Sequence, residues 1–167
     1  MDYSIPIKAK NEVIKYYKYD VHNDTRGAEL HSVTLNQLDS FISRITESVV
    51  INGEIYENTF HSHENEEKVI EVRPYKYYDD SINEEPIIER ITKIIKTDYS
   101  AQLSPQFVLE VYDVAENSEK IYSLEADTSL DIITILLDNQ RIIDGDAYAF
   151  IYSCLDLSKR KVYLFVE

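Results

Sequence analysis

A chain of 167 residues has the length of one ordinary domain, and its 44% hydrophobic residues with three glycines and four prolines are typical of a globular protein. The net charge of −14 argues against a surface that binds nucleic acid or anionic lipid, because such surfaces take their affinity from Lys and Arg. The N-terminus has no signal-peptide pattern, no apolar run is long enough to span a membrane, and the single cysteine has no partner within the chain, so we expect a cytoplasmic protein.

The first third of the chain predicts a strand, a helix and a hairpin. Residues 13–22 alternate β-branched and aromatic side chains, which is typical of a strand, and residues 23–29 are polar and predict a loop. Thr34 followed by Gln37 forms a capping box, and the apolar residues after it recur at helical spacing, so a helix is expected over 35–48. Asn52-Gly53 between two short apolar runs then predicts a hairpin.

The remaining elements alternate in the same irregular way. Residues 68–80 predict a strand in which Pro74 indicates an edge or a bulge. Helices are expected over 83–97 and 129–139, where isoleucines and leucines form apolar stripes. Two further pairs of strands are expected, at 107–114 with 120–126 and at 147–157 with 161–167.

Hairpins outnumber crossovers in this pattern. It predicts a single α+β domain over residues 1–167, with a predominantly antiparallel or mixed sheet and three amphipathic helices. A short similarity between "ISRIT" (42–46) and "IERIT" (88–92) is explained about equally well by chance and by an internal duplication.

The segment "TFHSHENEEK" (59–68) is the densest cluster of site-type residues. On a strand, His61 and His63 would share a face and could bind zinc or manganese with Glu64, Glu66 or Glu67, but the segment also fits a solvated loop or a protein-contact loop. No H-E-x-x-H or C-x-x-C pattern is present, and no histidine follows His63. We therefore expect no functional metal and no cofactor, with a small metal-dependent hydrolase centred on these histidines as an alternative.

Two other kinds of catalytic site are disfavoured. Cys154 lies within an apolar strand pattern, where cysteine usually behaves as a small buried hydrophobic residue. The three glycines are far apart, so the chain has no phosphate-binding glycine loop. Because no complete catalytic constellation is visible, we do not expect an enzyme.

The negative charge is concentrated in one part of the chain. Residues 98–156 hold twelve acidic residues against Lys120 and Arg141, a balance of −10. We expect the acidic side chains there, chiefly within residues 110–146, to form a partner-binding surface with charges spaced like phosphates. The predicted residues are Asp113, Glu116, Glu119, Glu125, Asp127, Asp138, Asp144 and Asp146.

This charge predicts a binding protein. The leading hypothesis is an acidic inhibitor that covers the basic surface of a nuclease or another nucleic-acid-binding effector, as an immunity protein or a phage-encoded inhibitor of a nucleic-acid-guided defence such as CRISPR would. Richness in Ile, Lys, Asn and Tyr is associated with AT-rich coding sequence, which favours a low-GC bacterium or its phage. A structural or assembly protein is the remaining alternative, and the sequence leaves the oligomeric state open.

Overall fold

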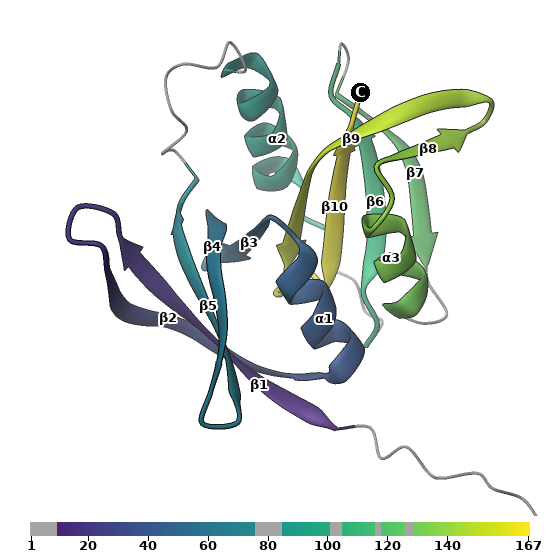
Figure 1. Cartoon of the computed structure of the whole chain (residues 1–167). Coiled ribbons are helices and arrows are strands. Elements are labelled where there is room, and N and C mark those ends of the chain that lie inside the picture. Colours follow the sequence, from purple (N-terminus) through teal and green to yellow (C-terminus); the bar gives the residue numbers. More distant parts are fainter. Residues whose placement is uncertain (1–9, 76–84, 101–104, 116–117, 126–128) are drawn as a thin grey trace, which may run out of the picture.

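The computed structural model describes residues 10–75, 85–100, 105–115, 118–125 and 129–167. Ten strands and three helices lie within these ranges (Figure 1), and no helix among the described residues is long and apolar enough to cross a membrane. In chain order the elements are β1 (Asn11–Asp20), β2 (Thr25–Asn36), α1 (Gln37–Ile45), β3 (Ser48–Ile51), β4 (Glu54–Glu64), β5 (Glu67–Pro74), α2 (Glu85–Thr97), β6 (Val108–Asp113), β7 (Glu119–Glu125), α3 (Ser129–Leu136), β8 (Gln140–Ile143), β9 (Asp146–Asp156) and β10 (Lys161–Val166).

The fold is largely β, so the predicted α+β class with three amphipathic helices is wrong. Strands make up 57% of the structure and helices 20%. Much of the difference comes from residues 25–36, because the predicted loop and helix entry form the long strand β2, which lies at one edge of the sheet beside β1. The helices α1 and α3 are shorter than predicted, and α3 has only eight residues, most of them apolar.

The first helix also begins at a different cap from the one predicted. Thr34 lies in β2 opposite Val13, so it cannot cap a helix. Asn36 is the N-cap instead, and its side chain accepts a hydrogen bond of 2.9 Å from the backbone N–H of Asp39.

The strands form two units with the same topology. In the first unit (β1–β5 with α1) the strand order is β2-β1-β5-β4-β3, and in the second unit (β6–β10 with α3) it is β7-β6-β10-β9-β8. The directions agree as well, because β1 and β5 are parallel, β6 and β10 are parallel, and every other neighbouring pair within a unit is antiparallel. In each unit the helix follows the first hairpin.

A constant shift of 92 residues relates the two units from the start of the helix to the end of the long strand. It carries residue 37 to residue 129 and residue 64 to residue 156. The hairpin registers agree under this shift, since Ser48 pairs with Glu57 as Gln140 pairs with Ala149. We call two residues related by this shift counterparts.

Backbone details repeat at counterpart positions. Gly53 and Gly145 both have positive φ in their hairpin turns, at +80° and +98°. The N–H of Asn58 donates to the carbonyl of Glu47 (2.8 Å), as the N–H of its counterpart Phe150 donates to that of Asn139 (3.0 Å). The sheet register also shifts at counterpart positions, next to residue 59 in β4 and next to residue 151 in β9. The units are therefore a structural repeat.

This repeat is not the one that the similarity between residues 42–46 and 88–92 indicates. That similarity would align α1 with α2, whereas the counterpart of α1 is α3. The helix α2 connects the two units in the chain.

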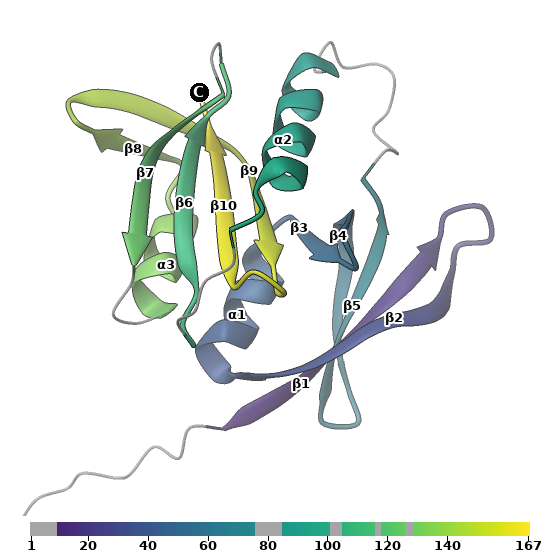
Figure 2. The same cartoon turned by 180° about the vertical axis from the view of Figure 1, so that it is seen from behind.

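The units join through one strand pair and one helix pair. Strand β3 of the first unit runs parallel to the second half of β9, with Ser48 opposite Cys154 and Val50 opposite Asp156. On one face of the sheet α1 lies beside α3, and the hydroxyl of Ser129 donates to the carboxylate of Asp39. Figures 1 and 2 show the two units on either side of this junction.

Each face of the sheet at the junction has its own hydrophobic cluster. Side chains of α1 and α3, including Ile42 and Ile133, pack against Val162 and Leu164 of β10. The alternate residues of the same strand, Tyr163 and Phe165, face the opposite cluster, which α2 covers with Ile91, Ile94 and Ile95. Alternate side chains of β10 point to opposite faces of the sheet, so this one strand contacts the helices on both faces.

A buried polar cluster ties the end of α2 to the second unit. Lys161 Nζ lies 2.7 Å from Asp98 Oδ2, 2.6 Å from Ser100 Oγ and 3.3 Å from Glu110 Oε1. Tyr163 donates to the same Asp98 oxygen at 2.8 Å. Every charge in this cluster has a close partner of opposite charge, which offsets the free energy that its removal from water costs.

Candidate protein-binding surface

The two histidines of residues 59–68 lie on the last part of β4, which pairs with β5 and turns at Asn65 and Glu66. Burial is the main cause that lowers the pKa of His61, and the positive charge of Arg44 on α1 is the second. His63 is exposed and lies opposite Lys68. The segment therefore forms the end of the β4–β5 hairpin.

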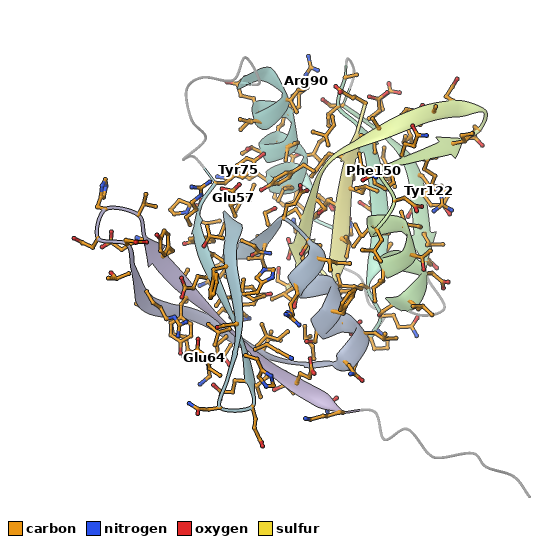
Figure 3. The ribbon with its side chains drawn as sticks, viewed as in Figure 1. Glu57, Glu64, Tyr75, Arg90, Tyr122 and Phe150 are labelled. Atoms are coloured by element: carbon orange, nitrogen blue, oxygen red, sulfur yellow. The ribbon has the colours of Figure 1, made fainter. Side chains whose placement is uncertain are left out.

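The described residues contain no group of three or more His, Cys, Asp or Glu side chains that could hold a metal ion. Glu64, a candidate ligand, is engaged by both terminal nitrogens of Arg26, at 2.7 and 2.9 Å. Hydrogen bonds from Arg26 and then from Ser62 lower the pKa of Glu64 to about 2. Figure 3 shows Glu64 near the end of its hairpin. That no functional metal binds here stays a prediction, and among the described residues the hydrolase hypothesis has no ligand set.

Cys154 is fully buried in β9, beside the helix α2. Burial raises the pKa of its thiol to about 12. The thiol is therefore protonated and shielded at neutral pH, which is unfavourable for a nucleophile.

Four of the predicted partner-binding residues lie at one end of the second unit. Asp113 ends β6 and pairs with Glu119, the first residue of β7, while Asp144 and Asp146 flank Gly145 in the turn between β8 and β9. We call these four carboxylates the acidic tip. Glu119, Asp144 and Asp146 are exposed, and Asp113 is partly exposed.

Tyr148 links the two hairpins of the acidic tip. Its pKa is raised by partial burial and then by the negative charges of Asp146, Asp113 and Asp144. The strand pairing places the two hairpin ends close together, because Val166 of β10 lies opposite Asp113 of β6 and opposite Phe150 of β9. Tyr148 is not among the residues predicted from the sequence, although its spacing of two from Asp146 on a strand puts both side chains on the same face.

The other predicted residues do not join the acidic tip. Glu125 lies at the opposite end of β7, since it pairs with Val108 at the start of β6. Asp138 follows α3 and donates its backbone N–H to Ile135, so it belongs to the end of that helix. Glu116 and Asp127 lie outside the described residues.

Ion pairing distinguishes the acidic tip from four glutamates of the first unit. In the first unit Glu57 pairs with Arg73, Glu67 with Lys15, and both Glu64 and Glu71 with Arg26. None of the four carboxylates of the acidic tip forms an ion pair with a described Lys or Arg side chain. The charge of the tip is therefore available to a binding partner.

Comparison with known proteins adds no identification, since no protein family, no curated protein and no solved structure matches this chain.

Proposed function

We propose that the protein binds a Lys- and Arg-rich protein surface through the acidic tip and inhibits that partner by covering its nucleic-acid-binding site. The observation that supports this proposal is the contrast in ion pairing: four glutamates of the first unit pair with Lys or Arg of the same unit, whereas the four carboxylates of the tip form no ion pair with a described Lys or Arg side chain. Carboxylates arranged around a tyrosine provide charge and an aromatic contact together, which suits a protein interface.

The partner is a nuclease or another nucleic-acid-binding effector, because such proteins present the phosphate-binding surface that an acidic tip complements. Binding is stoichiometric and involves no turnover. The cytoplasm is the proposed location, and the free, buried thiol of Cys154 is compatible with a reducing environment.

The test is a capture experiment with the intact chain, in which a bacterial lysate passes over immobilised protein and the bound proteins are eluted with rising salt. A tip variant, Asp113→Asn with Glu119→Gln, Asp144→Asn and Asp146→Asn, should lose basic proteins that the wild type retains. For a purified partner, the tip variant should associate at least about tenfold more slowly at low salt, and added salt should remove the difference.

The matched control removes four negative charges from exposed positions away from the tip, with Glu54→Gln, Glu66→Gln, Glu89→Gln and Glu125→Gln. If long-range attraction by net charge were sufficient, both variants would lose the partner equally, which contradicts a role for the tip. Binding that is unaffected by salt, or a target that is inactivated by far less than an equal amount of protein, also contradicts the proposal.

A further inference from the structure

Several large apolar side chains are exposed although their counterparts in the other unit are buried. Ile142 of β8 is 72% exposed, whereas its counterpart Val50 of β3 is 7% exposed. Phe60 of β4 is 56% exposed, whereas its counterpart Tyr152 of β9 is 6% exposed. The repeat therefore identifies positions at which one unit has a packing partner and the other unit has none.

The buried members of these pairs belong to the junction between the units. Val50 and Tyr152 pack in the same hydrophobic cluster, where β3 runs beside β9. On the other face Ile45 of α1, which is partly buried, packs against the cluster that contains Ile133 of α3. Their counterparts Leu137 and Phe41 are again exposed, at 63% and 42%.

The exposed residues fall into two complementary sets. Ile142 and Leu137 of the second unit are the counterparts of Val50 and Ile45. In the first unit, Val50 and Ile45 form that unit's side of the junction. Phe60 and Phe41 likewise take the positions of Tyr152 and Ile133, on the second unit's side. The chain thus carries both halves of a second junction, and these two halves do not contact each other.

The strand edges agree with the side chains. The junction uses the outer edge of β3 and the edge of β9 at residues 154–156. Among the described strands, β8 pairs with β9 alone, and β4 beyond Glu57 pairs with β5 alone. Free edges of this kind accept a further strand.

The two halves cannot meet within one chain. Strand β8 and the β4–β5 hairpin end lie on opposite sides of the molecule in Figure 1 and again in Figure 2. Two molecules are required to bring these surfaces together.

We propose that a second copy of this chain docks by placing its β4 edge, with Phe60 and Phe41, on the β8 edge of the first, with Ile142 and Leu137. The strands run parallel, and the register of the junction places Gln140 opposite Ser62, Arg141 opposite His63 and Ile142 opposite Glu64. The contact is heterologous, so it adds copies head to tail. It is independent of the proposed inhibitory function.

Added salt should change the affinity of this contact and the affinity for a basic partner in opposite directions. Each molecule carries a net charge of −14, so two copies repel one another and added salt strengthens self-association by screening. Binding of a basic protein through the acidic tip weakens in salt. The two proposals can therefore fail separately.

The test uses two variants that each block one surface, Ile142→Asp and Phe60→Asp, in analytical ultracentrifugation up to millimolar concentration in low and high salt. Wild-type protein should associate with rising concentration, and each variant alone should associate about 30-fold or more weakly, because a charge is placed in the centre of the contact. Both side chains are mostly exposed in the free chain, so both variants should fold, which circular dichroism would verify.

Mixing the two variants is the decisive measurement. The β8 edge is intact in Phe60→Asp and the β4 edge is intact in Ile142→Asp, so the mixture should form a one-to-one complex and nothing longer. Leu130→Asp is the matched control, because Leu130 and its counterpart Leu38 are both exposed, at 55% and 41%, and this variant should associate like the wild type. A wild type that stays monomeric in high salt, variants that still associate, or a mixture that forms no complex would each overturn the proposal.

Discussion

Lys161→Met tests the buried cluster that ties the end of α2 to the second unit. The lysine side chain is 1% exposed and lies 2.7 Å from Asp98 and 3.3 Å from Glu110. Methionine fills most of the same volume but leaves two carboxylates without their shared cation. Breaking a buried ion pair costs about 3 to 5 kcal/mol. Because Glu110 keeps a contact with Lys120 at 3.4 Å, we expect the lower end, about 3 kcal/mol.

The loss of unfolding free energy in Lys161→Met should depend on pH in a predictable direction. Burial would raise the pKa of Asp98, but hydrogen bonds from Lys161, Ser100 and Tyr163 outweigh burial and hold this pKa below its ordinary value. Such a carboxyl stabilises the fold above its unfolded pKa, about 3.9, and the contribution is lost as the pH falls through the folded value. Without Lys161, only the hydrogen bonds from Ser100 and Tyr163 oppose the effect of burial, so the pKa of Asp98 should rise relative to the wild type, and the variant should be most destabilised near neutral pH and less so toward about pH 4.

Urea unfolding followed by circular dichroism, at neutral pH and near pH 4, measures both effects. Lys120→Met is the matched control: Lys120 is half exposed, and its loss should cost at most about 1 kcal/mol. The double variant Lys161→Met with Asp98→Asn should be more stable than Lys161→Met alone, since one unpaired carboxylate is removed. A cost below about 1 kcal/mol for Lys161→Met, or an equal cost at both pH values, would refute the reasoning.

Three further predictions concern the repeat, the acidic tip and the buried thiol. Gly53→Ala and Gly145→Ala each place a Cβ on a backbone of positive φ with open space around it, so both should lower the unfolding free energy by about 1 to 2 kcal/mol in urea titrations; a cost at only one position would contradict the equivalence of the turns. Asp146→Asn should lower the pKa of Tyr148, followed by NMR of ring-labelled tyrosine, and an unchanged titration would show that the carboxylate does not act on this phenol. Cys154 should react with a thiol reagent at mildly alkaline pH only as fast as the protein unfolds, and rapid reaction in native buffer would contradict its burial.

Some local signals predicted the structure correctly, although the capping box at Thr34 did not. Asn52-Gly53 forms the predicted hairpin turn, because these residue types tolerate positive φ. The second hairpin of the last third, β9 with β10, and the pair β6 with β7 also lie where alternation predicted strands. Each of these features depends on residues close together in the chain.

The edge strand β2 shows why the fold class was wrong. Most of its side chains are exposed, so residues 25–36 carry little of the apolar alternation that marks a strand. Its strand conformation comes from pairing with β1. Pairing of this kind satisfies backbone groups and does not need a hydrophobic pattern.

For the candidate surface, the sequence determined how much negative charge the chain carries and in which third of it, because formal charge is a property of residue type. Only the tertiary structure decided which carboxylates act together. Pairing of β10 with β6 on one side and with β9 on the other gathers Asp113 and Asp146 around Tyr148, while Arg26 binds Glu64 across 38 residues of chain. The repeat was decided in the same way, because few side chains are shared between counterparts and the likeness lies in strand order, register and turn geometry. Those features arise from backbone hydrogen bonds between distant segments, which many different side chains permit.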